Sequence, residues 1–116
     1  MAIEADILRG YTDTILLARL DKGDSYGYLI NKRISEISLG EVELKEATLY
    51  TAFRRLEKDG CIRSYWGDET TGARRRYYTL TQEGRRRLNE ERKAWQNTKQ
   101  MLSMLIGDET DESPAE

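Results

Sequence analysis

The side chains best suited to chemistry in this sequence are cationic, and they gather in its middle. They are Arg54, Arg55 and Lys58, followed by the consecutive Arg74, Arg75 and Arg76. Guanidinium and ammonium groups bind the phosphate oxygens of nucleic acids, and arginine also pairs with the major-groove edge of guanine. These residues therefore predict a surface that binds double-stranded DNA. The alternative is that they only keep exposed faces soluble.

The charge distribution favours the DNA-binding interpretation. The 116-residue chain has a net charge of −2, but residues 45–93 hold 13 basic and 8 acidic side chains, which is a local charge of +5. Residues 1–44 and 107–116 are acidic. Because exposed charges are screened beyond about 8 Å at physiological salt, the local charge matters more for binding than the total.

The sequence gives little support for catalysis or metal binding. The sequence has no histidine, which is the commonest general base and metal ligand, and its single cysteine, Cys61, can form neither a cysteine zinc site nor an internal disulfide. Carboxylates are plentiful, but none is spaced with a nucleophile, a glycine-rich phosphate loop or metal ligands. We therefore expect a protein that is not an enzyme and needs no metal or cofactor.

The sequence also indicates where the protein works. No segment is apolar over the roughly 18 residues that a membrane span requires. The N-terminus carries Glu4 and Asp6 and lacks the basic and then apolar pattern of a secretion signal. We expect a cytoplasmic protein without membrane contact.

The first cations belong to a predicted helix that begins near 45–47 and ends at Gly60. Leu49, Phe53 and Leu56 recur at i, i+4 and i+7 and should face the core. The opposite face and its flanks carry small, polar and cationic residues, namely Lys45, Ala47, Thr48, Tyr50, Thr51, Arg54, Arg55 and Lys58. Such a helix can place its first turns against base edges and its later residues against phosphates.

A hairpin follows that helix and carries the three consecutive arginines. It should pair residues 62–66 with 75–80 across a polar loop, and Val42–Leu44 could add a short strand at its edge. Its aromatic residues are more often packing than base-stacking surfaces. Since side chains of a strand alternate between faces, at least one of the arginines should reach phosphate or a minor groove.

Three motifs in this region carry a family resemblance. Residues 46–50 (EATLY), 56–62 (LEKDGCI) and 74–81 (RRRYYTLT), with Gly84 after them, resemble the signature of the PadR family of bacterial transcriptional repressors. The short chain is similar to the subgroup with one C-terminal helix. The resemblance implies a winged helix-turn-helix in which Tyr50 and the region of Tyr26 also lie against DNA. Ala73 stands where the family often has proline, which predicts a more mobile wing tip.

Two further helices should complete the DNA-binding unit. The first spans residues 3–20, with Ile7, Tyr11 and Ile15 in its apolar stripe, and the second spans residues 26–38 and ends at Gly40. Asp24 or Ser25 could cap the second helix. The first stripe is wider than one small core requires, so part of it is available to a second subunit.

The last helix is predicted over residues 82–106, with Thr81 as its N-cap and Gly107 as its end. Leu88, Trp95 and Leu102 repeat every seven residues, and such a narrow seam calls for a partner. We expect the helix to pack on the first helix of a second copy in a two-fold dimer. The expected interface residues are Ile7, Tyr11, Leu88, Trp95, Leu102 and Leu105.

Trp95 also suggests a small-molecule site. A two-fold axis near it would place two indole rings across a gap, where a planar aromatic or cationic ligand could stack. The family resemblance adds Ile7 and Asp13 as wall residues, and Glu91 and Lys99 lie one turn on either side of Trp95. The alternative is that Trp95 only anchors the dimer.

Together these patterns predict a mainly α fold with a small β-hairpin. Residues 1–80 should form a winged-helix DNA-binding domain, 81–107 a dimerisation helix, and 108–116 a disordered acidic tail. The expected partners are operator DNA with an inverted repeat, a second copy of the chain and a small effector. The alternative function is a winged helix that contacts only proteins.

Overall fold

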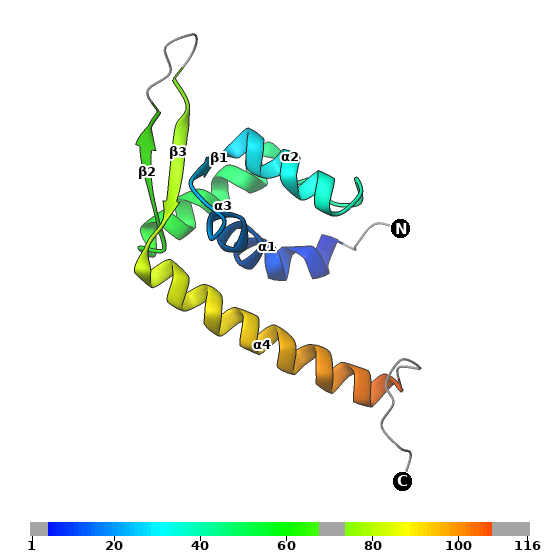
Figure 1. The fold of residues 1–116 in the computed structure, drawn as a ribbon. Helices are drawn as coiled ribbons and strands as arrows, with labels where there is room; N and C mark the ends of the chain where they lie inside the picture. The colour runs from blue at the N-terminus through cyan, green and yellow to red at the C-terminus, as the bar shows by residue number, and fades with distance from the viewer. Residues whose placement is uncertain (1–4, 68–73, 108–116) are drawn as a thin grey trace.

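Four helices and a small antiparallel sheet make up the residues that the structure describes (Figure 1). The computed structural model describes residues 5–67 and 74–107. In chain order the elements are α1 (Ala5–Leu20), β1 (Ser25–Tyr26), α2 (Gly27–Ile37), α3 (Glu46–Lys58), β2 (Ile62–Trp66), β3 (Arg76–Leu80) and α4 (Gln82–Ile106). The predicted mainly helical fold with a hairpin wing and a long last helix is confirmed. The predictions for Ala73 and the tail 108–116 lie outside the described residues.

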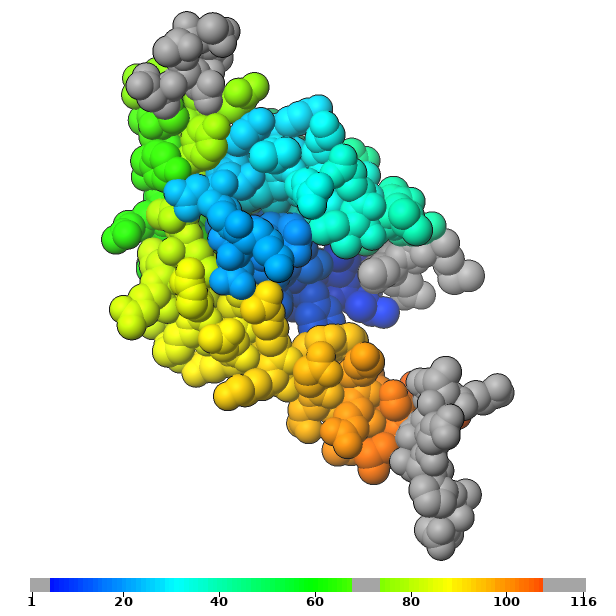
Figure 2. Space-filling model, viewed as in Figure 1, coloured from blue at the N-terminus to red at the C-terminus, as the bar shows by residue number. Residues whose placement is uncertain are grey.

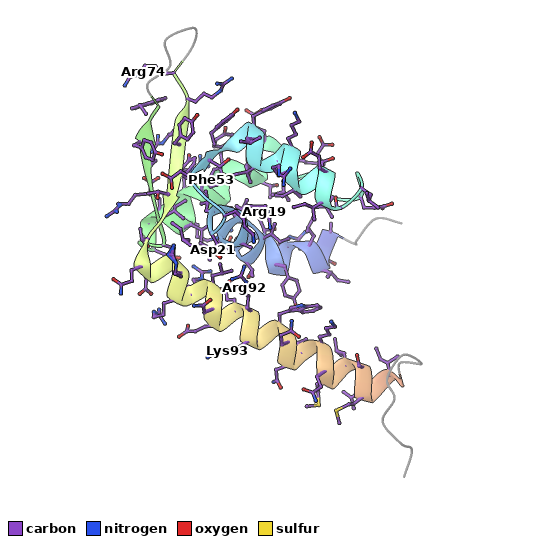
Figure 3. The ribbon with its side chains drawn as sticks, in the orientation of Figure 1. Arg19, Asp21, Phe53, Arg74, Arg92 and Lys93 are labelled. Carbon is purple, nitrogen blue, oxygen red and sulfur yellow. The ribbon has the colours of Figure 1, made fainter. Side chains whose placement is uncertain are left out.

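The core lies where α1, α2, α3 and the sheet meet, and apolar side chains at helical spacing fill it. Its buried members include Leu16, Leu17, Ile30, Ile34, Leu49, Phe53, Leu56 and Ile62. Phe53 lies between the helices and the sheet (Figure 3), and its ring stacks on that of Tyr78 with centroids 4.1 Å apart. The recognition helix predicted from the sequence is therefore fixed to the wing through an aromatic pair.

The turn between α2 and α3 is held by side chains and not by a strand. The Asn31 amide donates to the Leu44 carbonyl (2.7 Å) and accepts from the Leu44 amide (3.0 Å). The amide of Val42 donates to the Ser38 hydroxyl (2.9 Å). Because these side chains satisfy the backbone, Val42–Leu44 does not pair with the wing, and the predicted strand there is wrong.

The strand that does edge the wing is β1. The sheet order is β1-β3-β2, with Ser25 opposite Tyr78 and Ile62 opposite Leu80. Ser25 is therefore committed to the sheet, and Tyr26, not Asp24 or Ser25, precedes the first turn of α2 without a side-chain cap. The hairpin itself pairs Ile62–Trp66 with Arg76–Leu80, as predicted to within one residue.

The long helix α4 begins and ends as the sequence predicts. The Thr81 hydroxyl accepts from the Gly84 amide (3.0 Å), and Gly107 closes the helix in the left-handed region at φ 80°. The first half of α4 packs on α1 of the same chain. Asp21, just after α1, lies 3.5 Å from Arg92 (Figure 3) and 3.8 Å from Arg85.

Packing within the chain corrects one interface prediction. Leu88 is completely buried against its own core, so it cannot contact a second copy. The second half of α4 instead extends away from the body and stands clear of the other helices (Figures 1 and 2). Its exposed apolar side chains are Trp95, Met101, Leu102, Met104, Leu105 and Ile106. Within the described residues, no helix combines the length and apolar character needed to cross a bilayer.

Candidate nucleic-acid interface

The outer face of α3 is polar and open to solvent. Leu49, Ala52 and Phe53 anchor the helix in the core. The residues left exposed on the other side are Lys45, Glu46, Ala47, Thr48, Thr51, Arg54 and Lys58. Ala47, Thr48 and Thr51 leave room for a close approach, and Arg54 and Lys58 stand further along, as the sequence predicts. Lys45 adds a cation at the N-cap of the helix.

Tyr50 joins α3 to the beginning of α2. Its ring meets Phe53 edge-on with centroids 5.7 Å apart, and about a third of the residue is exposed. A Cβ atom at Gly27 would lie 2.5 Å from the Tyr50 hydroxyl oxygen. The phenol therefore packs directly on the Gly27 backbone, and a side chain at position 27 would require the Tyr50 ring to move. Tyr50 lies at the surface because it packs between α2 and α3, and part of its ring stays exposed.

The wing arginines alternate between the two faces of the hairpin, as predicted. The Arg75 guanidinium lies over the Tyr26 ring (4.8 Å) on one face. On the other, Arg74 lies over Trp66 (5.5 Å) and Arg76 donates to the Ser64 hydroxyl (2.8 Å). Arg74 stands at the end of the wing furthest from α4 (Figure 3). These aromatic contacts keep guanidinium groups extended toward solvent, since a ring attracts a cation without neutralising it.

The aromatic residues of the hairpin serve mainly as packing. Tyr65 stacks on Tyr77 (5.6 Å), and the Tyr65 hydroxyl donates to an Asp24 carboxylate oxygen (2.6 Å), which raises the pKa of the phenol. Tyr26 meets Tyr77 edge-on (5.3 Å). This row ties the wing to the residues that precede α2, so the wing is held at a defined angle to the helices.

A groove runs between the wing and the start of α2. Its volume is about 470 Å³, and its lining residues are Tyr26, Gly27, Tyr28, Tyr50, Arg74, Arg75 and Arg76. The structure thus brings together five residues that the sequence predicts separately. Gly27 and Tyr28 were missed. Tyr28 is strongly exposed and lies off the apolar stripe of α2, which is the signal that could have found it.

Arg55, which the sequence places in the DNA-contact set, also has an acidic partner within the chain. Its guanidinium forms two hydrogen bonds to the Asp13 carboxylate of α1 (2.5 and 3.1 Å), and this pairing raises the pKa of Arg55. The side chain therefore links α3 to α1. Periodicity places Arg55 on the flank of the exposed face, but it does not reveal an acceptor 42 positions earlier in the chain.

The residues predicted to bind a ligand divide into two groups. Trp95 meets Tyr11 of the same chain edge-on, with ring centroids 5.5 Å apart, and both Trp95 and Ile7 keep about half of their surface exposed. Lys99 is exposed as well. Asp13 and Glu91, in contrast, are held by arginines of this chain and do not stand as free charges beside Trp95. Among the described residues, no cluster of histidine, cysteine and carboxylate side chains could hold a metal.

Known proteins resemble this chain over most of its length. Residues 16–90 match the Transcriptional regulator PadR-like family. A transcriptional regulator from Clostridium thermocellum is 45% identical, with a TM-score of 0.83 over 90% of this chain and 99% of that one. A PadR family transcription regulator from Clostridium difficile is 36% identical, with a TM-score of 0.75 over 83% and 98%. An uncharacterised protein from Lysinibacillus sphaericus is 38% identical over 90% of this chain and 95% of its own length.

The order of motifs, the wing and the single long last helix thus agree with these relatives in both sequence and fold. The chain belongs to the PadR-like family of transcriptional regulators, which bind DNA and are not enzymes.

Proposed function

We propose that this regulator is a dimeric, sequence-specific repressor whose two α3 helices enter successive major grooves of an inverted-repeat operator. The observation that carries the proposal is the groove in which Tyr50 of α3, the start of α2 and the wing arginines line one surface. The proposed DNA contacts are Tyr26, Lys45, Thr48, Tyr50, Thr51, Arg54, Lys58, Arg74, Arg75 and Arg76. Helix N-terminal residues would read base edges while the wing neutralises phosphates.

The dimer follows from the apolar end of α4. Large apolar side chains are exposed there in one stretch, and Ile7 of α1 is exposed too. A second copy would cover such a patch, which a single small protein rarely leaves open to water. The proposed interface is Ile7, Tyr11, Trp95, Leu102 and Leu105. Sedimentation velocity measures the oligomeric state directly, and a monomer at micromolar concentration would contradict the proposed dimer.

DNA binding is tested by selecting bound fragments from the source genome and measuring affinity for the recovered operator against salt. Release of counterions from about four to eight phosphates predicts a log–log slope of roughly −4 to −7. An affinity that does not change with salt would refute the proposal. Absence of retention on any DNA at low salt would favour the alternative function, a winged helix that contacts only proteins. A promoter fusion in cells, with and without the regulator, tests repression and operation in the cytoplasm.

A second candidate function is release from DNA by a planar aromatic or cationic effector beside Trp95. The supporting observation is that Trp95 and Tyr11 meet edge-on while the indole stays partly open, at the surface where the second copy is expected. Stacking on the indole would bind a flat ring. Because Asp13 and Glu91 are already paired with arginines, planarity is better supported than positive charge as the selecting feature.

Fluorescence titration with a planar cationic dye tests the effector site. Trp66 would contribute a second signal, so the parent for this measurement carries Trp66→Phe. Saturable quenching of Trp95 in this parent would support the site. Because Trp95→Ala leaves no tryptophan to quench, dye binding to that variant is followed by the fluorescence anisotropy of the dye itself. Binding that disappears while the dimer persists would support the site, and binding that survives the substitution would place the dye elsewhere.

A further inference from the structure

An ionic cluster joins the recognition helix to the long helix, and neither DNA contact nor dimer contact explains it. It lies where α1, the end of α3 and α4 meet. We call it the Arg87 cluster, and its members are Asp13, Arg55, Asp59, Arg87 and Glu91. These charged groups come from three separate segments of the chain, so the cluster is a property of the tertiary fold.

Arg87 is the centre of this cluster because each of its three guanidinium nitrogens has a different acceptor. Nε donates to Glu91 one turn along α4 (2.9 Å). One terminal nitrogen donates to Asp13 of α1 (3.1 Å), and the other reaches Asp59 (3.4 Å), the residue that caps α3. One planar group thus holds α4 against both of the other helices.

The partners of Arg87 are themselves fixed. The second Glu91 oxygen accepts from the Thr14 hydroxyl of α1 (2.5 Å), and Asp13 also receives the two bonds from Arg55 of α3. About a quarter of the Arg87 side chain is exposed, and less of Asp13, so the bonds are shielded from water better than ordinary surface pairs. The hydrogen bond that Arg87 donates to Glu91 raises the pKa of the guanidinium.

The neighbouring Arg86 provides a natural contrast. Among the described residues, its ion-pair partners are Glu83 and Glu90, which belong to the same helix. Its loss would remove the same positive charge from α4 without breaking an ion pair to α1 or α3. These consecutive arginines therefore differ in whether they connect α4 to the recognition helix.

We propose that Arg87 is a positioning residue: it fixes the angle between α3 and α4 and thereby sets the separation of the two recognition helices in the dimer. The inference rests on the proposed dimer and its inverted-repeat operator. Because α4 would carry the contacts between copies and α3 would enter the groove, their mutual angle determines which half-site spacing fits. In this proposal Arg87 contacts neither DNA nor the second copy and acts only through the two helices.

The first test measures the distance between the two α3 helices in the full-length dimer without DNA. Thr51 is replaced by p-acetylphenylalanine and coupled to a nitroxide, because position 51 lies on the exposed face of α3 and the ketone reaction leaves Cys61 unlabelled. Pulsed dipolar spectroscopy should give a narrow distance distribution for this parent and for Arg86→Ala. In Arg87→Ala the distribution should broaden or shift.

The outcomes of this measurement separate the inference from the function on which it depends. Identical distributions in the parent and in Arg87→Ala would overturn the inference and leave the dimer standing. A parent without any dipolar modulation would overturn the dimer, and with it the inference.

The second test uses the operator duplex selected with the parent protein, variants of it with base pairs added or removed between half-sites, and an isolated half-site. The parent should prefer one spacing. Arg87→Ala should weaken that preference by about 2- to 30-fold, the size typical of couplings between sites, while half-site affinity stays unchanged. Arg86→Ala should keep both properties.

A conservative variant tests whether misfolding, and not the loss of positioning, explains a weakened spacing preference. Arg87→Lys keeps the charge, but an ammonium group cannot hold three acceptors in one plane, so it should lose the spacing preference as Arg87→Ala does. Its thermal midpoint should stay close to that of the parent. Retention of the spacing preference in Arg87→Lys, or an equal loss for half-site and operator in both variants, would overturn the positioning role.

Discussion

One glycine decides how closely α4 approaches the end of α3. A Cβ atom at Gly84 would overlap the Cys61 carbonyl oxygen and would lie 2.7 Å from a side-chain carbon of Leu80. The same carbonyl accepts from the Thr81 amide (3.0 Å), so the backbones of the two segments are in direct contact. Thr81 can cap α4 and α3 can end at Gly60 in this arrangement only because position 84 has no side chain.

Gly84→Ala should therefore lower the free energy of unfolding by about 1–3 kcal/mol, since the clash is with backbone and cannot be relieved by a rotamer change. Urea denaturation measures this loss. Gly10→Ala is the matched control, because Gly10 lies within α1 with open space around its Cβ position. The control should gain about 0.5–1 kcal/mol from higher helix propensity. Equal effects at both positions would contradict the close approach.

Tyr78 gives the fold a dependence on alkaline pH. Burial raises the pKa of its phenol above the ordinary value, so the folded state retains the proton more tightly than the unfolded chain. The resulting stability is complete below the unfolded pKa of about 10 and is lost as the pH rises through the folded pKa. The free energy of unfolding should fall as the pH rises above about 10, and Tyr78→Phe should reduce the slope. An unchanged slope would rule out Tyr78 as its source.

At the scale of elements, the wing is a folded hairpin that presents positively charged side chains. Its strands are held by stacked tyrosines and by Phe53, and aromatic rings lie beneath Arg74 and Arg75. Arg76 also lies 3.5 Å from Glu57 of α3. The wing therefore carries three consecutive cations, and at least the last of them links it to α3.

Replacing Arg74 and Arg75 with alanine should weaken binding to operator and to unrelated DNA alike, because phosphate contacts carry no sequence information. The slope of log affinity against log salt should become shallower by about 1 for each phosphate that the variant no longer neutralises. Electrophoretic mobility shifts at several salt concentrations measure both effects. Arg86→Ala, which removes a charge from α4, should leave the slope unchanged. Weaker binding confined to the operator would contradict a backbone role for these arginines.

The elements also show which features the sequence can predict. The bounds of α3, the hairpin and α4 follow from local signals, namely a 3.6-residue stripe, glycines at helix ends and the Thr81 cap. The two-residue strand β1 lacks such a signal, because its pairing with Tyr77 and Tyr78 joins positions more than 50 residues apart. The contacts of Arg55 and Leu88 within the chain were not predicted for the same reason. Their partners are set by the packing of α1 and α4, which periodicity does not encode.

At the scale of the whole molecule, α4 divides into a half that packs on its own chain and a half whose apolar side chains are exposed. The division falls near Trp95, which still contacts Tyr11. Before it, Leu88 is sealed in the core. After it, Leu102 and Leu105 face solvent. A helix with this division would transmit the position of a second copy directly to the domain that carries α3.

Leu102→Glu should convert the proposed dimer into a folded monomer, because the side chain is half exposed within its own chain and the charge would be buried only between copies. Operator affinity should then fall by about 100-fold or more through loss of bivalent binding. Sedimentation velocity and mobility shifts measure the two effects. Leu39→Glu is the control, since Leu39 is almost fully exposed after α2. A dimer that survives Leu102→Glu would place the interface elsewhere.

Cys61 turns the junction of α3, β2 and α4 into a place that can be observed chemically. It is the only thiol in the chain, it is buried, and its sulfur lies 3.9 Å from an Arg87 nitrogen. An added disulfide reagent can reach this sulfur only when the junction opens locally. The rate of thiol modification in the unaltered protein thus reads out how often the three segments separate, and slower modification on adding DNA would register their tightening in real time.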